Sequence, residues 1–161
     1  APVNMRARFL QMIERESQHA MAGRGGRIRV KINGLTDPEV IAALYRASGA
    51  GVRCELIVRG ICSLRPGVPG LSDNISVRSI LGRFLEHARI FEFGNDGDPQ
   101  YFIGSADWRP RNLSRRVEVA TPVVHPAHCG ILASILDEDL RNPTAWLLQP
   151  DGSYRRDPAI G

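Results

Sequence analysis

A strand, a helix and a second strand follow one another between residues 27 and 58, and this succession limits the possible folds more than any other feature. Residues 27–33 have the length of a strand, and residues 52–58 are a mostly apolar run of strand type. Between them, residues 36–39 read Thr-Asp-Pro-Glu and predict a helix start, with a capping side chain, a proline in the first turn and a glutamate near the positive end of the helix dipole. A helix placed in this way lets the two strands lie parallel through a right-handed crossover. The sequence therefore predicts an α/β fold.

The rest of the chain supplies further elements. Apolar residues at helical spacing predict an amphipathic helix over residues 3–20. Strands are predicted at 75–80, 89–93, 100–103 and 116–120, and a last helix at 126–141 is expected to bury Ile131, Leu132, Ile135 and Leu136. The tail beyond residue 143 is polar, with Trp146 and Tyr154 as anchors, while Trp108 is expected to pack in the core. The glycine-rich stretch 23–26 resembles a phosphate loop in composition, but it leads into a strand and is interpreted as a plain turn.

Length and composition give expectations for the number of domains and for the ligands of the chain. At 161 residues it is expected to form one domain, residues 1–161. It carries 21 Lys and Arg against 17 Asp and Glu, and Lys31 is the sole lysine. Arginine binds phosphate through a planar fork, although a high-GC genome gives the same bias. Only arginines beside phosphate-binding turns are therefore counted as evidence.

The spacing of the cysteines and the hydropathy of the chain indicate where in the cell the protein is located. The three cysteines form no CxxC motif and favour a reducing cytosol over a disulfide framework. No stretch reaches the roughly 18 consecutive apolar residues of a membrane span, and no signal peptide opens the chain. These features predict a cytoplasmic protein without a membrane span. Because the first residue is Ala1 and a helix follows almost at once, we expect a piece of a longer protein.

A histidine, a cation and a small-residue turn lie in a layout suited to phosphoryl chemistry. His87 and Arg89 are two residues apart, so on an extended strand both point to one face and can reach one anion. The turn at Gly104-Ser105 offers backbone N–H groups and a hydroxyl to an oxyanion, and Arg83 precedes His87 by one helical turn. An imidazole there can accept a phosphoryl group, move a proton or hydrogen-bond a phosphate. The alternative is a structural histidine that caps a short helix at the edge of the core.

Further arginines lie where ligands bind in α/β sheets, at the C-terminal ends of strands. Arg59 is at such an end, where it can grip a phosphate or simply cap a loop. The loop that follows, residues 61–74, carries Arg65, and loops of this length are commonly functional. A basic cluster that can guide a polyanion, partly a solvated face, consists of Arg109, Arg111, Arg115 and Arg116. The remaining histidines, at positions 19, 125 and 128, lack ligand neighbours at metal spacing and are expected to be structural.

Two family resemblances follow from these motifs. His87-Ala88-Arg89 with the Gly-Ser-Ala-Asp run at 104–107 resembles a degenerate HxK…GSxN signature of the phospholipase D superfamily, with arginine in place of the lysine and aspartate in place of the asparagine. Much closer is the C-terminal region of the first polyphosphate kinase family, which the chain resembles from about residue 30 to its tail. The segments that carry this resemblance are residues 37–48, 56–62, 64–75, 82–87, 104–108, 110–113 and 151–154.

The resemblance implies a fold and an activity. The fold is an α/β, phospholipase D-like domain with a mixed, mostly parallel sheet and helices on both faces. The intact enzyme is expected to transfer the terminal phosphate of ATP reversibly to polyphosphate, through a phosphohistidine formed in the preceding domain. Its ligands would be ATP/ADP and polyphosphate, with Mg²⁺ as cofactor held by residues outside this chain. A homo-oligomer is expected when full length, in the cytoplasm or associated with the membrane through the full-length protein.

The resemblance also assigns residues. It implies that Arg59 and His87 approach the nucleotide phosphates, with His87 as an acid or base, that the 61–74 loop lines the same cavity, and that the isolated piece is inactive. Spacing and resemblance together predict the substrate-binding residues Arg59, Arg65, Arg83, Arg89, Ser105, Arg109 and Arg111.

Two other functions stay open. One is a phosphodiesterase of the phospholipase D superfamily that joins two identical half-sites, with one histidine from each subunit. The other is a basic module that binds polyanions or nucleic acid without turnover, for which steep salt dependence is expected.

Overall fold

The structure is a computed structural model that describes residues 4–156. Four α-helices, one 3₁₀ helix and eight strands alternate along this part of the chain. In chain order they are α1 (Met5–Met21), β1 (Arg27–Ile32), α2 (Pro38–Gly49), β2 (Arg53–Val58), β3 (Ile75–Ser79), β4 (Ile90–Phe93), η1 (Asn95–Gly97), β5 (Gln100–Gly104), α3 (Pro110–Ser114), β6 (Ala120–Val123), α4 (Pro126–Leu140), β7 (Trp146–Leu148) and β8 (Tyr154–Arg156). The predicted start of α1 at residue 3 lies outside the described residues.

All eight strands belong to one sheet, in the order β6-β5-β4-β1-β2-β3-β7-β8. The α/β class and the mixed sheet are confirmed. The expectation of mostly parallel pairing is wrong: β1, β2 and β3 are parallel, while the five other neighbouring pairs are antiparallel. Parallel pairing is limited to β1, β2 and β3, because the helix α2 and the loop 61–74 each return the chain to the end of the sheet at which the preceding strand began.

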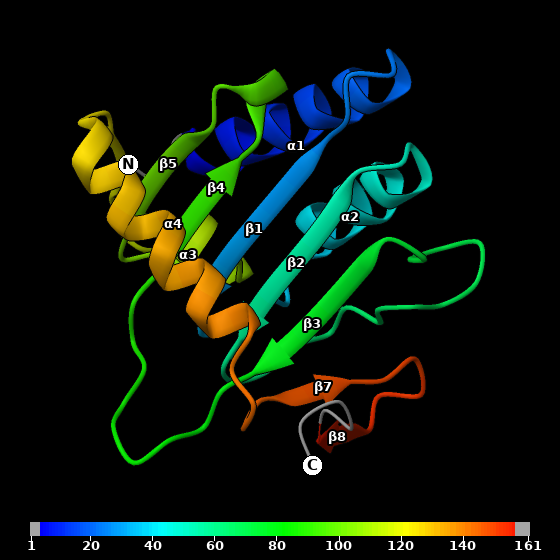
Figure 1. The fold of residues 1–161 in the computed structure, drawn as a ribbon, viewed down its shortest axis with the longest axis vertical. Helices are drawn as coiled ribbons and strands as arrows, with labels where there is room; N and C mark the ends of the chain where they lie inside the picture. Colours follow the sequence, from blue (N-terminus) through cyan, green and yellow to red (C-terminus); the bar gives the residue numbers. More distant parts are fainter. Residues whose placement is uncertain (1–3, 157–161) are drawn as a thin grey trace.

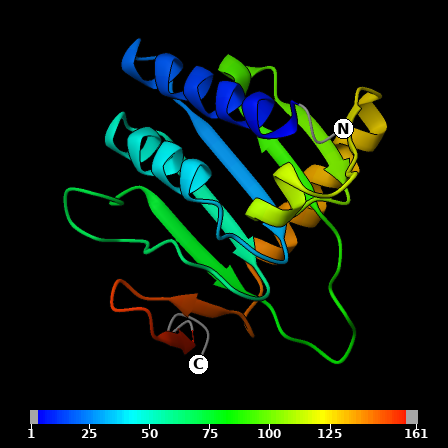
Figure 2. The same cartoon turned by 180° about the vertical axis from the view of Figure 1, so that it is seen from behind.

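Helices cover both faces of the sheet, as predicted. In Figure 1, α4 crosses in front of the strands, and Figure 2 shows α1, α2 and α3 on the opposite face. The larger apolar core lies under α1 and α2, where Phe9, Phe91 and Trp108 pack with ring centroids 4.7–5.6 Å apart. A smaller core under α4 contains Ile57, Ile80, Ile90, Tyr101, Leu136 and Ala145. Trp108 is fully buried, which confirms its predicted packing role.

The βαβ unit forms as predicted from β1, α2 and β2, with parallel register from Arg27↔Arg53 to Ile32↔Val58. Asp37 caps α2, because its carboxylate accepts hydrogen bonds from the N–H groups of Glu39 and Val40, both at 3.1 Å. The same carboxylate is fully buried and accepts from Arg6 of α1 at 2.7 Å. One side chain therefore starts α2 and joins it to α1.

Two predictions near the C-terminus are wrong. The strand expected at 116–120 forms instead as β6 at Ala120–Val123, and Val117 is 87% exposed. In α4 only Leu136 is fully buried, whereas Ile131 is 57% exposed. The sheet face beneath α4 carries charged side chains, described below, so the apolar contact is narrow. The tail also continues the sheet, as β7 and β8, which the sequence did not predict.

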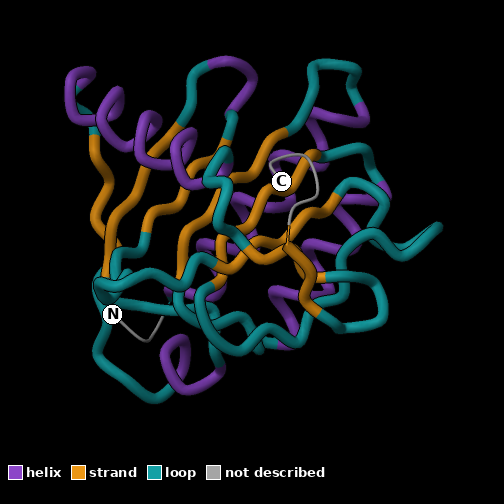
Figure 3. Tube along the Cα trace, turned by 60° about the horizontal axis from the view of Figure 1, so that its bottom comes forward, coloured by secondary structure: helices purple, strands orange, loops and turns teal. Residues whose placement is uncertain are grey.

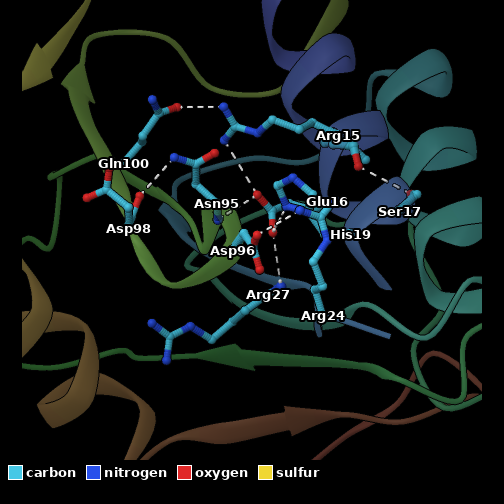
Figure 4. Close-up of polar contacts among 11 residues, drawn as sticks. Arg15, Glu16, Ser17, His19, Arg24, Arg27, Asn95, Asp96, Asp98 and Gln100 are labelled. Carbon is cyan, nitrogen blue, oxygen red and sulfur yellow. Dashed lines mark hydrogen bonds and ion pairs between the residues drawn. The ribbon is translucent and has the colours of Figure 1, made fainter. Parts of the chain in front are cut away.

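A polar cluster closes the sheet edge at which β1 begins (Figure 4). The fully buried carboxylate of Glu16 accepts hydrogen bonds from the backbone N–H groups of Asn95, at 2.8 Å, and Arg27, at 3.3 Å. Arg15 contacts it at 3.4 Å. These contacts join α1, β1 and η1, and the glycine-rich stretch before β1 is a turn, as predicted. The cluster therefore holds α1, η1 and the start of β1 together.

No helix among residues 4–156 is both long and apolar enough to cross a membrane.

The first prediction concerns Asp37. Asp37→Ala should lower the free energy of unfolding by about 2–3 kcal/mol, because a helix cap contributes about 1 kcal/mol and the buried ion pair is lost as well. Arg6, with 25% of its side chain exposed, can regain water, which keeps the loss below that for a fully buried cation. Urea unfolding measures it. Glu39→Ala is the control: this carboxylate is 61% exposed and 3.6 Å from Arg6, so the loss should stay under about 1 kcal/mol. Equal losses for both variants would contradict this account.

Candidate functional site

The candidate site lies at the edge where the parallel strands β1, β2 and β3 end. This edge is at the bottom of Figure 1, and Figure 3 turns it forward, where loops drawn in teal cover much of it. The first residues beyond β1 and β2 are Asn33 and Arg59. The loop 80–89, here called the histidine loop, carries His87 and Arg89 from β3 to β4. The parallel crossover thus brings together segments that are far apart in the sequence.

Asn33 and Arg59 are neighbours across the ends of β1 and β2. The N–H of Arg59 donates to the carbonyl of Ile32 at 3.2 Å, and the N–H of Gly60 donates to the carbonyl of Asn33 at 2.9 Å. The parallel ladder therefore runs one step beyond the two strands. The Arg59 side chain is half-buried, and its backbone carbonyl accepts from the buried hydroxyl of Ser79 at 2.9 Å. The end of β3 thus holds Arg59 from the other side.

Asp107 links this edge to the histidine loop. It is 6% exposed and accepts from the N–H of Asn33 at 2.7 Å. It also accepts from Nε and Nη2 of Arg89 at 3.2 and 3.3 Å, while Nη1 of Arg89 donates to the carbonyl of His87 at 3.0 Å. The fork of Arg89 is therefore occupied by a buried carboxylate, and through it the chain fixes the backbone at His87.

The strand geometry predicted for His87 and Arg89 is wrong. β4 begins at Ile90, so both residues lie in a loop and do not share a strand face. The physical reason is Asp107, whose burial requires a cation, and Arg89 supplies it. The imidazole of His87 is exposed, so it can still meet a ligand or another part of the protein. A short-helix cap, the structural alternative, is not formed, since no helix lies between β3 and β4.

A second tether holds the same loop. Nζ of Lys31 donates to Glu86 at 2.7 Å and to Asp139 of α4 at 2.6 Å, and Lys31 is only 6% exposed. Burial acts to lower the pKa of the ammonium, but the two carboxylates outweigh it and raise that pKa above its usual value. The stabilisation is therefore complete below the ordinary lysine pKa and is lost only as pH rises through the raised pKa. At neutral pH the residue next to His87 is anchored to the central strand.

The two tethers contrast with the rest of the loop. Leu81, Phe84 and Leu85 are 63%, 79% and 74% exposed, and Arg83 lies over the ring of Phe84 at 5.9 Å. Arg83 is thus exposed near the tip rather than at the sheet edge. The loop is held mainly by Glu86 and Arg89, one on each side of His87.

The other predicted residues are spread around the edge. The hydroxyl of Ser105 donates to Glu118, whose second oxygen accepts from Asn112 at 2.8 Å, so this hydroxyl serves a buried network. The stem of Arg109 lies against Gly34, where a Cβ would be 2.8 Å from Cδ of Arg109. Arg111 is exposed on α3. Arg65 lies elsewhere, against the Gly152 turn, with its N–H donating to the Tyr45 hydroxyl at 2.9 Å.

A metal site does not emerge from this geometry. No group of three or more His, Cys, Asp or Glu side chains that could hold a metal comes together between residues 4 and 156. Two carboxylates near this edge, the buried Asp107 and the partly buried Asp139, are paired with Arg89 and Lys31. The described residues therefore do not fit a Mg²⁺ site of their own.

Three residues of this edge escaped prediction: Lys31, Asn33 and Glu86. One signal was present, since Arg29, Lys31 and Asn33 alternate along a central strand and must share one face. Arg29 and Lys31 reach Asp137 and Asp139 of α4, so that face is the one α4 covers. Their carboxylate partners lie more than 50 residues away in the sequence, at separations of 55 and 108, and no local pattern identifies them.

Comparisons with known proteins agree on one family. The family model "Polyphosphate kinase C-terminal domain 2" matches residues 1–159. A polyphosphate kinase of Thermosynechococcus vestitus is 61% identical over 100% of this chain and 22% of its own length. The crystal structure of polyphosphate kinase from Porphyromonas gingivalis superposes with a TM-score of 0.92 at 42% identity, over 95% of this chain and 24% of that one.

A more distant structure shares the fold alone. Nuc of Salmonella typhimurium, a phospholipase D family member, has a TM-score of 0.55 at 14% identity, with 88% of this chain and 89% of that chain covered. The phospholipase D-like fold is thereby confirmed. The chain spans about a fifth of the length of the polyphosphate kinases that it matches.

The second prediction tests the Lys31 tether. Glu86→Ala should speed tryptic cleavage after Arg83 about fivefold, because losing a half-exposed ion pair lowers the local opening free energy by about 1 kcal/mol. The initial cleavage rate of the folded protein measures it. Glu138→Ala is the control. It removes an exposed carboxylate next to Asp139, near the C-terminal end of α4, and should leave the cleavage rate unchanged. Equal rates for the wild type and Glu86→Ala would show that the tether does not hold the loop.

Proposed function

Because the chain belongs to the polyphosphate kinase family, whose C-terminal domain 2 it matches, we propose that it forms one wall of the active site of an enzyme that transfers phosphoryl groups between ATP and polyphosphate. The observation that carries the proposal is the position of Arg59 and His87. Both lie at the edge where three parallel strands end, which is where α/β sheets bind ligands. The full-length protein is expected to work as a homo-oligomer, in the cytoplasm or associated with the membrane.

Arg59 is assigned to the phosphates of the nucleotide. Its guanidinium presents a planar fork that matches two phosphate oxygens, and its backbone is fixed on both sides by β1 and Ser79. Arg89, also predicted to bind substrate, has a different role in this proposal: its fork holds Asp107 and thereby the His87 backbone. Arg109, beside Gly34, is near enough to the edge to guide a polyanion.

His87 is assigned to the transferring group. In the proposed reaction, a histidine in the preceding domain attacks the γ-phosphorus of ATP, and ADP leaves with the bridging oxygen. A terminal oxygen of polyphosphate then attacks the phosphohistidine, and the bond from nitrogen to phosphorus breaks. The exposed imidazole of His87 can hydrogen-bond the phosphoryl oxygens or carry a proton during either step. Mg²⁺ would arrive on the nucleotide phosphates, since the described residues do not form a site for it.

The half-site phosphodiesterase gains no support from the site. It needs a free cation two residues after the histidine, whereas Arg89 is bound to Asp107. The binding-module alternative does not need an exposed histidine at the sheet edge. We therefore place the kinase ahead of both.

The third prediction tests the division of labour between domains. The full-length protein should form polyphosphate from ATP and Mg²⁺, while the present chain alone should form none, because the proposed nucleophile lies outside it. Chromatography of radiolabelled polyphosphate measures the product, and circular dichroism confirms that the isolated chain is folded. Turnover by the isolated chain would assign the nucleophile to His87 and overturn the scheme. An inactive full-length protein would overturn the proposed function itself.

The fourth prediction concerns His87. In the full-length enzyme, His87→Ala should lower kcat by roughly 10²-fold, the range for a positioned acid, base or phosphate ligand. His87→Gln separates these roles: it keeps a hydrogen-bond donor but cannot titrate, so rescue by glutamine indicates phosphate binding and no rescue indicates proton transfer. His128→Ala, an exposed histidine on α4, is the matched control and should keep the wild-type rate. A near wild-type rate for His87→Ala would make His87 dispensable.

A further inference from the structure

Among the described residues, a few buried side-chain polar atoms lack a hydrogen-bond partner, and Asn33 alone contributes two of them. Asn33 is 9% exposed, and neither its Nδ2 nor its Oδ1 has a hydrogen-bond partner among residues 4–156. An amide buried without partners opposes folding, since it has given up water and gained nothing in return. Buried unsatisfied groups are rare in proteins and mark sites of strain, of catalysis or of a missing ligand.

Strain does not explain the orphan amide. The backbone of Asn33 is well bonded: its N–H donates to Asp107 at 2.7 Å and its carbonyl accepts from Gly60 at 2.9 Å. The contact with Gly60 is so close that a Cβ there would lie 2.7 Å from the Asn33 carbonyl oxygen. Asn33 is therefore held rigidly, and only its side chain lacks partners.

The position of Asn33 shows which groups it faces. Strand alternation puts its side chain on the same face as Lys31 and Arg29, the face that α4 covers. On β2, Ile57 packs in the core under α4, so Arg59, two residues on, projects to that face as well. Asn33 and Arg59 are adjacent across the extended ladder. The orphan amide therefore lies beside the arginine to which the phosphate is assigned.

We propose that Asn33 is a phosphate-binding residue, whose Nδ2 donates to a non-bridging oxygen of the phosphate that Arg59 grips. Oδ1 then accepts from Arg59, whose five N–H donors exceed what one phosphate takes. A cation is a poorer match for the amide, because the nearby carboxylates of Asp107 and Asp139 are already paired with Arg89 and Lys31. The proposal rests on the proposed function. It adds to the site a neutral amide donor, which binds a phosphate oxygen without adding charge.

The fifth prediction tests this with Asn33→Leu, which keeps the shape and removes both polar atoms. Titration calorimetry of the full-length protein with tripolyphosphate should show at least a tenfold loss of affinity, with an unchanged or higher Tm, because two unsatisfied polar atoms are replaced by apolar ones. Asn33→Ala gives a second, smaller side chain if leucine prevents folding. Arg59→Ala is the positive control and should also weaken binding.

Asn95→Ala is the matched negative control. This asparagine lies at the opposite edge of the sheet, with φ of 46° and its Nδ2 donating to the Asp98 carbonyl at 3.0 Å, so its loss should lower Tm and leave affinity unchanged. Tripolyphosphate affinity within twofold of wild type for both Asn33 variants overturns the proposal. Wild-type binding without phosphoryl transfer refutes the proposed function alone, because the affinity comparison still decides the role of Asn33. Absence of wild-type binding overturns both.

Discussion

The charged row on the buried face of β1 is the constraint around which this fold is arranged. Arg29 and Lys31 project beneath α4 and are 6% exposed each. Burying a cation is unfavourable unless a carboxylate accompanies it. The chain supplies carboxylates from three elements: Glu92 of β4, Asp137 and Asp139 of α4, and Glu86 of the histidine loop. Pairing these charges therefore fixes where α4 and the loop lie on the sheet.

The two faces of β1 have different tasks. Ile28, Val30 and Ile32 face the apolar core, where burial of apolar area is the main source of stability. The opposite face adds little net stability, since desolvation of buried ion pairs offsets most of their attraction. Its contribution is to position α4. A helix that packs through leucine alone can shift along the sheet, whereas a helix that must pair with two cations has a single register. The candidate site lies at the end of this charged face of β1, where Asn33 is the next residue after Lys31 on the same face.

The fold was predictable where the signals are local. The cap at Asp37, the apolar strands and the helix between them lie within about 30 residues, and they specify the parallel pair that creates the site edge. The predicted position of β6 and the predicted burial of α4 were wrong, because both depend on partners far away in the sequence. β6 begins at Ala120, opposite Gly104 at the end of β5, because Asp107 beyond that end is bonded to Asn33 and Arg89. α4 buries little apolar surface because it meets Arg29 and Lys31.

The site was predictable in its chemistry and less so in its geometry. Arg59 follows a strand end, so its position could be derived from the sequence. Arg89 could not be assigned correctly, because the sequence does not show that Asp107 is buried beside it, 18 residues away. The tether from Lys31 to Glu86 likewise joins residues that no spacing rule connects. Hydrogen-bond partners across a sheet depend on topology, and topology was known only in part.

Two buried asparagines differ in whether the fold provides hydrogen-bond partners for their side-chain amides. Asn112 is 8% exposed, almost as buried as Asn33 at 9%, yet its Nδ2 donates to Glu118 at 2.8 Å. The chain thus provides a partner where the amide serves the structure. At Asn33 the same burial comes with a rigid backbone, an adjacent arginine and no partner for either side-chain atom among residues 4–156. A leucine would fit the demand for burial better at that position, so the amide is explained by what binds there rather than by the fold.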